Sequence, residues 1–176
     1  PADAAGGSAQ AQNVPGVMTP ADPVAFRKTE ARASAINPAS AIAIRDVATL
    51  REWIAAARDT GLVAFNTQTT SLDPMRAELA GFSLALEPGK AAYVPLAHKS
   101  GAGDLLGGGT VEDQIPVREA LAELRALLED RAVLKIAQDL KFDLVVMQRH
   151  GIDIAPFDDT MLMSYALDAG MAASHS

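Results

Sequence analysis

The sequence contains no cysteine among its 176 residues, and aromatic residues make up only 5% of it. The first absence excludes disulfide bonds, thiolate zinc sites and cysteine nucleophiles. The second means that a hydrophobic core has to be built mainly from Leu, Ile, Val and Ala. No apolar run approaches the roughly 20 residues that a membrane-spanning helix requires, and the first residues lack the basic start and apolar middle of a signal peptide. We therefore expect a cytoplasmic protein with no membrane partner.

Basic residues are also scarce. Lys and Arg number 15 against 22 Asp and Glu, which gives a formal net charge of −7. This balance argues against a broad basic surface that grips duplex DNA through its phosphates. It is compatible with a small nucleic-acid site, because metal-dependent nucleases are locally acidic.

Composition divides the chain near residue 40. Residues 1–40 are rich in Ala, Gly, Pro and Ser and show no sustained period. Such a segment buries too little apolar surface to offset the entropy lost on ordering, so it is predicted to be a flexible linker. The rest, residues 41–176, is long enough for one domain.

Hydrophobic periodicity predicts a mixed α/β domain. Asp46 and Gly61 are typical of the cap and the end of a helix. A Gly-rich segment at residues 98–114 lacks the GK[ST] ending of a phosphate-binding loop and is predicted to be a mobile loop. The predicted strands are residues 41–46, 62–67, 79–86, 91–97 and 132–137, and the predicted helices are 47–60, 115–130, 139–151 and 161–170. Three consecutive strands followed by alternating strand and helix indicate a mixed sheet covered by helices.

One short stretch, residues 63–74, carries an unusual pair of amides. Asn66 and Gln68 come at the end of an apolar strand, two positions apart. Residues at that spacing share a face of a strand, so both amides are expected to point to one place. Packing does not require this pair, and an Asp and a Glu in the same positions would make a metal site.

Carboxylates form two further clusters. Asp139 and Asp143 lie four apart on a predicted helix and hence on one face. Asp158 and Asp159 precede the last helix, where Asp159 is expected to be a cap. Asp139 is also explained as a cap, but Asp143 lies in an apolar helical segment. A lone buried carboxylate is costly unless it is paired or bound to a cation.

These motifs carry a resemblance to a known family. The segment VAFNTQTTSLDPMRAELAGFSLALEPGKAAYVPLAH resembles the first motif region of the 3′–5′ exonuclease domain of bacterial DNA polymerase I, one of the DEDD exonucleases. That family has Asp-x-Glu where this chain has Asn66-Thr67-Gln68. It has Asn-Leu-Lys-Tyr/Phe-Asp where this chain has Asp139-Leu140-Lys141-Phe142-Asp143. The resemblance continues into FDDTMLMSYALDAG and covers about Ala41 to Gly170 in unbroken order.

The resemblance implies a ribonuclease H-like fold and removal of 3′-terminal nucleotides by two-metal hydrolysis, with Mg²⁺ or Mn²⁺. It places the catalytic and metal-binding positions at Asn66, Gln68 and Asp143. It also implies two partners, a single-stranded DNA 3′ end and the polymerase domain of a parent chain. The residues that it implies in nucleic-acid binding are Thr67, Thr69, Leu72, Asp139, Lys141 and Phe142.

The departures from the family predict an inactive, C-terminally truncated domain. Asn66 and Gln68 keep the shape of Asp and Glu but carry no charge, through either engineering or natural loss. The family's last motif, Tyr-x-x-x-Asp, is not assigned to Tyr165 and Asp168, which are spaced Tyr-x-x-Asp. Of four family carboxylates, this leaves Asp143. Two alternatives stay open: a noncatalytic module that binds single-stranded DNA or braces a polymerase, and a ribonuclease D-like RNA exonuclease.

Overall fold

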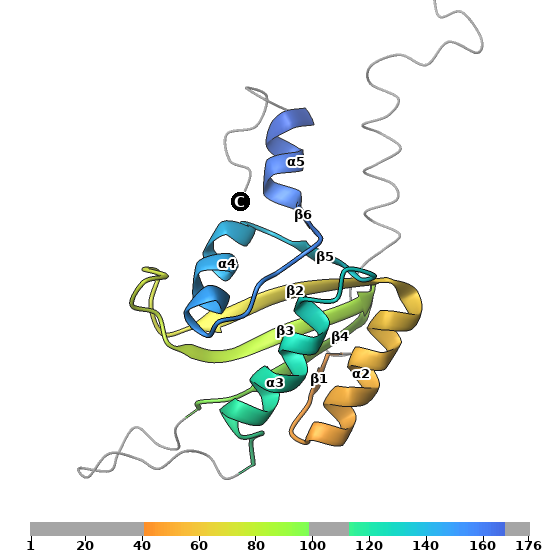
Figure 1. Cartoon of the computed structure of the whole chain (residues 1–176), viewed down its shortest axis with the longest axis vertical. Helices are drawn as coiled ribbons and strands as arrows, with labels where there is room; N and C mark the ends of the chain where they lie inside the picture. The colour runs from red at the N-terminus through yellow and green to blue at the C-terminus, as the bar shows by residue number, and fades with distance from the viewer. Residues whose placement is uncertain (1–40, 99–112, 168–176) are drawn as a thin grey trace, which may run out of the picture. The chain divides into compact units, whose positions relative to one another are not determined.

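The computed structural model describes residues 41–98 and 113–167. The linker expected at residues 1–40 and most of the predicted Gly-rich loop, residues 99–112, lie outside the described residues. Figure 1 shows that the described part contains one sheet with helices beside it. The sheet has six strands in the order β1 (Ile42–Ala43), β4 (Lys90–Pro95), β3 (Leu79–Glu87), β2 (Leu62–Thr69), β5 (Leu134–Ala137) and β6 (Phe157–Asp159).

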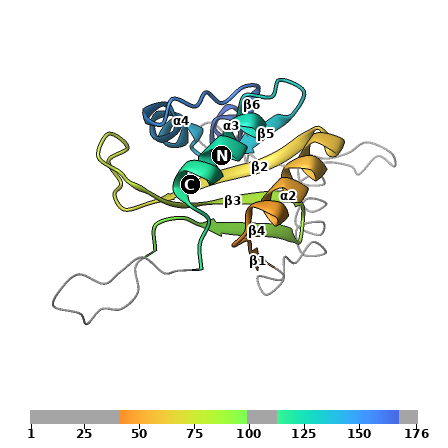
Figure 2. The same cartoon turned by 60° about the horizontal axis from the view of Figure 1, so that its bottom comes forward.

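The strand directions confirm the predicted mixed sheet. Strands β2, β3 and β4 form an antiparallel meander, while β5 pairs with β2 in parallel and β6 pairs with β5 in parallel. Strand β1 pairs with β4 in parallel at the other edge, and β1, β4, β3 and β2 follow one another in Figure 2. The central position of β2 places its polar end in the middle of the sheet.

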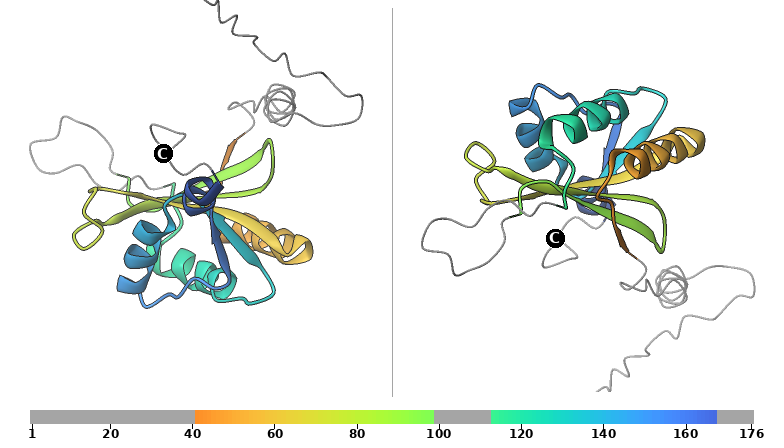
Figure 3. Two further views of the ribbon diagram at one scale, coloured as in Figure 1. Left: turned by 90° about the horizontal axis from the view of Figure 1, so that it is seen from above. Right: turned by 90° about the horizontal axis from the view of Figure 1, so that it is seen from below.

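Among the described residues, helices α2 (Val47–Thr60), α3 (Val117–Leu128) and α4 (Leu140–Arg149) lie on one face of this sheet, as both views of Figure 3 show. Helix α2 has the predicted ends, because Asp46 accepts from the backbone N–H of Thr49 at 2.8 Å and Gly61 adopts the left-handed conformation with φ 70°. Burial alternates along β2, so Val63, Phe65 and Thr67 face the helices and form part of the core.

The C-terminal part of the described chain differs from the prediction in one element. Strand β6 is not evident from the sequence, because it has three residues and no apolar alternation. It is defined by its pairing with β5, in which Lys135 lies opposite Phe157 and Ala137 opposite Asp159. The last predicted helix is α5 (Thr160–Leu167), which has no buried residue. Within residues 41–98 and 113–167, none of the helices has both the length and the apolar character needed to cross a membrane.

Candidate functional site

The two amides of the polar strand end lie on the same face of β2, as their spacing predicts. Asn66 and Gln68 are both exposed, and they point away from the face on which Val63 and Phe65 are buried. Gln68 Nε2 donates a hydrogen bond to Asn66 Oδ1 at 2.8 Å. The pair therefore satisfies part of its own hydrogen-bonding capacity without any ligand.

Asp143 approaches the same strand end from helix α4. Its side chain is buried, with 1% of the residue exposed. The oxygen Oδ1 accepts two hydrogen bonds from Thr67, one from the backbone N–H at 3.0 Å and one from the hydroxyl. The other oxygen, Oδ2, is buried and has no hydrogen-bond partner among the described residues. Thr67 thus orients the carboxylate and leaves one of its oxygens uncompensated.

A pocket of about 320 Å³ brings the amides and the carboxylate together. All three residues predicted to be catalytic contribute to its wall, as do five of the six residues predicted to bind nucleic acid. Lys141 is exposed and does not line the pocket. The lining residues are Asn66, Thr67, Gln68, Thr69, Ser71, Leu72, Gln138, Asp139, Phe142 and Asp143.

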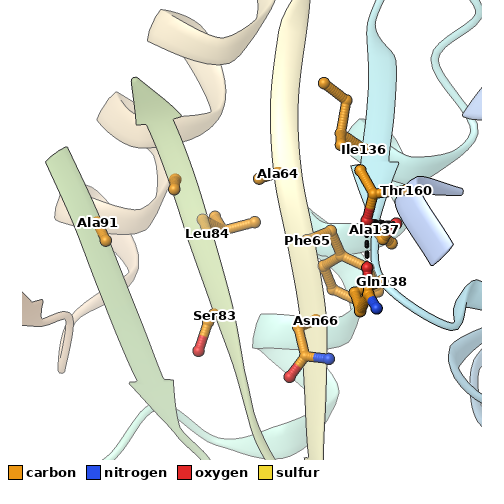
Figure 4. A pocket seen from close by; sticks show the side chains of 11 residues that line it. Ala64, Phe65, Asn66, Ser83, Leu84, Ala91, Ile136, Ala137, Gln138 and Thr160 are labelled. Carbon is orange, nitrogen blue, oxygen red and sulfur yellow. Dashed lines mark hydrogen bonds between the residues drawn. The ribbon is translucent and has the colours of Figure 1, made fainter. Parts of the chain in front are cut away.

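A second pocket, of about 340 Å³, adjoins the first through Asn66 and Gln138. Figure 4 shows it against strands β2, β3, β4 and β5, with Asn66 at one end and the hydrogen bond between Thr160 and Gln138 beside it. Its remaining wall is mainly apolar and includes Ala64, Leu84 and Ile136. Asn66 therefore lies at the boundary between a polar pocket and an apolar one.

The electrostatics of Asp143 oppose its ionisation. Burial raises the pKa of the Asp143 carboxyl, and the carboxylates of Asp139 and Asp159 raise it further. The two hydrogen bonds from Thr67 act in the opposite direction, because they stabilise the charged form. An ionised Asp143 is thus under-compensated, and a cation beside it would relieve that cost.

Asp159 organises the start of α4. Its side chain accepts from the backbone N–H of Asp139 at 3.3 Å and of Leu140 at 2.9 Å. The same carboxylate accepts from Met161 and Leu162 at the start of α5, at 2.9 and 3.4 Å. The predicted cap of the last helix is confirmed. Asp139, by contrast, makes no side-chain capping bond to α4.

The charges present do not fit a two-metal centre. Two divalent ions bring four positive charges, whereas the described residues of the pocket offer one buried carboxylate with an unpartnered oxygen, one exposed carboxylate and three neutral amides. No group of three or more His, Cys, Asp or Glu residues in the described ranges could hold a metal ion. Since Mg²⁺ is commonly bound through one or two carboxylates and several waters, the donor set fits one ion better than two.

Sequence reasoning did not identify every residue that shapes the site. Thr67 is expected from the resemblance to contact nucleic acid, but its hydroxyl is occupied by Asp143 and the residue is only 7% exposed. Ser71 and Gln138, which line the pocket, were not predicted. The only signal for Gln138 is its position between a buried strand and the start of a helix, where polar side chains reach a site at the strand end.

Comparisons with known proteins agree with the family resemblance seen in the sequence. The sequence profile of a family described as 3′–5′ exonuclease matches residues 41–176. DNA polymerase I of Rhizobium leguminosarum is 54% identical over 172 residues, which cover 91% of this chain and 17% of that protein. DNA polymerase I of Pseudomonas aeruginosa is 38% identical over 129 residues, covering 72% of this chain and 13% of the relative.

A solved structure supports the fold alone. Escherichia coli RNase D, described as an exoribonuclease involved in structured RNA processing, superposes with a TM-score of 0.51 at 19% identity. The match covers 75% of this chain and 30% of RNase D. It agrees with the ribonuclease H-like sheet expected from the sequence, but at this identity it carries no information about substrate. The chain spans less than a fifth of the length of the two polymerase relatives.

Proposed function

This chain belongs to the 3′–5′ exonuclease family of bacterial DNA polymerase I, and we propose that its site receives a single-stranded DNA 3′ end but hydrolyses it at a negligible rate. The proposal assigns the pocket between β2 and α4 to the terminal nucleotide. It also assigns residues 41–176 to an exonuclease-like domain and residues 1–40 to a linker.

One observation carries the proposed loss of hydrolysis, the hydrogen bond between Gln68 Nε2 and Asn66 Oδ1. Two carboxylates in these positions would repel each other and would need cations between them. Two amides instead form a neutral pair that is stable without cations. Amide oxygens are dipoles, so they offset the charge of a divalent ion poorly and replace its hydration shell at a net cost.

The family is metal-dependent, and Asn66, Gln68 and Asp143 are the residues that would hold Mg²⁺ or Mn²⁺ here. Bound in a pair, such ions stabilise the attacking and leaving oxygens of phosphodiester hydrolysis. The chain's own residues have simpler tasks. Thr67 fixes the orientation of Asp143, and the half-buried ring of Phe142 supplies an apolar wall.

Pocket size and charge favour a strand end over a duplex. A volume of about 320 Å³ is at the lower limit for small-molecule sites and suits one nucleotide. Among the described residues, the pocket wall contains no Lys or Arg, so this part of it lacks the phosphate-neutralising groups that duplex binding requires. In a longer protein of the length of the polymerase relatives, the neighbouring partner would be a polymerase domain.

Mononucleotide release from a 3′-labelled single strand tests the proposal. We expect negligible release by the unmodified chain with Mg²⁺ or Mn²⁺, and saturable binding of the same strand by fluorescence anisotropy. The matched variant, Asn66→Asp with Gln68→Glu, is expected to bind divalent metal more tightly. Robust metal-dependent release of mononucleotides by the unmodified chain would show that the two amides do not prevent hydrolysis.

An RNA strand of the same sequence separates the alternatives. Tighter binding of RNA than of DNA would favour a ribonuclease D-like role. A chain that binds neither strand would favour the structural module that the sequence left open. Either result would overturn the proposed recognition of a DNA 3′ end. Equal affinity of the unmodified chain and the matched variant for divalent metal would overturn only the proposed cause of inactivity.

A further inference from the structure

Asp139 is held in an uncommon backbone conformation at the wall of the polar pocket. Its φ is 54° and its ψ is 50°, and it is the only non-glycine residue in the described ranges with a positive φ. Asp and Asn tolerate this left-handed region better than other non-glycine residues do. The residue stands between β5 and α4, and it lines the same pocket as Asp143.

The carboxylate of Asp139 is not used to stabilise the helix that it precedes. The usual role of an Asp at this position is to accept from the first N–H groups of the helix. Here Asp159 accepts from the N–H of Leu140 at 2.9 Å, and Asp139 makes no side-chain capping bond. Its charge is exposed at the pocket, and helix capping gives no reason for it.

The second observation is independent of Asp139. Asp143 is 1% exposed, lines this pocket, and has a buried oxygen without a partner. The two charged side chains that act electrostatically on Asp143 are both negative, the carboxylates of Asp139 and Asp159. Within residues 41–98 and 113–167, no Lys or Arg side chain contributes to the pocket wall. A pocket with two like charges, an orphaned carboxylate oxygen and no cationic side chain is one that a cation stabilises.

We propose that Asp139 and Asp143 together hold a single divalent cation, with Asp139 as the second charged ligand of the pocket. The inference rests on the proposed function, because it concerns the same site, and adds a residue to it. Two carboxylates and several retained waters are a common set for Mg²⁺ and serve Mn²⁺ equally. The amide oxygens of Asn66 and Gln68 are available as neutral ligands. One ion cannot provide two-metal hydrolysis, so a site that holds a single cation would still hydrolyse DNA at a negligible rate.

The experiment is a titration of the full chain with Mn²⁺ alone, followed by calorimetry and by the loss of free Mn²⁺ signal in electron paramagnetic resonance. Asp139→Asn is the informative variant, since Asn also accepts the left-handed conformation and keeps the fold. We expect it to weaken Mn²⁺ binding by at least about tenfold, the loss typical of removing even an indirect metal partner. Asp143→Asn should remove the binding entirely.

Asp158→Asn is the matched control. It removes the same charge from an exposed residue of β6 that does not line the pocket, so it should leave the affinity unchanged. If Asp139→Asn and Asp158→Asn weaken Mn²⁺ binding equally, the loss reflects the overall charge of the chain and not a ligand. That result would overturn the assignment. Absence of Mn²⁺ binding by the unmodified chain would overturn it too. If the variant with Asn66→Asp and Gln68→Glu then binds Mn²⁺, the proposed function stands although this inference fails.

Discussion

Thr67 and Asp143 form a buried contact that ties the central strand to helix α4. The backbone N–H of Thr67 donates to Asp143 Oδ1 at 3.0 Å, and the Thr67 hydroxyl donates to the same oxygen. Thr67 also lies between Asn66 and Gln68, with its side chain on the opposite face of β2. The position of the carboxylate is thus set by the strand that presents the two amides.

Replacing Asp143 by Asn should stabilise the metal-free chain at neutral pH. Burial raises the pKa of Asp143 above its ordinary value of 3.8, so the folded state binds this proton more tightly than the unfolded state does. The resulting stability is present below pH 3.8 and is lost as the pH rises through the folded pKa. Asn stays neutral and retains an oxygen for Thr67. We expect a gain of about 1–3 kcal/mol in the free energy of unfolding at pH 7.

Urea unfolding of both proteins across pH 3 to 8, in EDTA, measures this effect. The difference between them should shrink toward zero as the pH falls below 3.8, where the carboxyl becomes protonated in both the folded and the unfolded state. Asp153→Asn is the control, because Asp153 is an exposed carboxyl near the same helix. A difference that does not vary with pH would mean that Asp143 is not a buried, ionised group at neutral pH.

Thr67→Val should destabilise the fold by about 1–3 kcal/mol at pH 7, because it removes a donor from a buried charge while keeping the shape of the side chain. It should also raise the pKa of Asp143 further, so the loss should become smaller in acid. Thr67→Ser keeps the hydroxyl and is the matched control. Equal losses in Val and Ser variants would assign the effect to packing and not to the hydrogen bond.

The sequence predicted the sheet well because its signals are local. Asp46 and Gly61 mark the ends of α2, and the meander of β2, β3 and β4 follows from three short apolar runs joined by turns. Strand β6 was missed because three residues without alternation carry no local signal. It exists only through parallel pairing with β5, which is a long-range interaction.

The sequence indicated some of the residues that line the candidate pocket, but not the contacts between them. The spacing of Asn66 and Gln68 and the buried character of Asp143 were visible in the sequence, and all three line one pocket. The bond from Thr67 to Asp143 joins residues 76 positions apart, which no single-sequence pattern reports. The cap of α4 was also missed, because the accepting residue, Asp159, lies in a different element, β6, well after the helix in the sequence.

Asp159→Ala should cost about 2 kcal/mol, since one carboxylate caps two helices and a cap contributes about 1 kcal/mol. The Asp158→Ala variant removes the neighbouring exposed carboxylate and should change the free energy of unfolding by less than about 0.5 kcal/mol. Urea unfolding monitored by circular dichroism compares the two. Equal stability of both variants would contradict the double capping role.

Lys135→Met should destabilise the chain by about 3 kcal/mol, although Met fills about the same volume as the methylene chain of Lys. Lys135 is fully buried in β5, and its Nζ donates at 2.7, 2.8 and 2.7 Å to the backbone carbonyls of Asp130, Val133 and Ala155, with a longer contact of 3.4 Å to that of Leu127. Met would remove this donor from all four carbonyls, of which those of Leu127 and Asp130 still accept from the backbone N–H groups of Asp130 and Val133. Lys90→Met, at an exposed position, is the control for hydrophobic substitution. An unchanged midpoint in urea would show that the carbonyls find water instead.

The amide pair offers a test in which two single substitutions are mild and their combination is not. In Asn66→Asp, the new carboxylate still accepts from Gln68 Nε2, and in Gln68→Glu the Asn66 amide can rotate and donate to the new carboxylate. Each single variant therefore keeps one hydrogen bond between the two side chains. The double variant has two carboxylates, no donor between them, and like charges at neighbouring positions of one strand face.

We therefore expect a double-mutant cycle in EDTA to give an unfavourable coupling of about 1–2 kcal/mol in the free energy of unfolding, beyond the sum of the two single effects. Because the exposed part of this repulsion is screened by salt, the coupling should fall as NaCl rises from 10 mM toward about 1 M. It should also fall, or change sign, when millimolar Mn²⁺ is added, since a bound cation favours the double variant. Urea unfolding of the four proteins under the three conditions measures it. Additive single effects in EDTA would show that the two side chains do not interact, and that the neutral pair is not what keeps this site stable without metal.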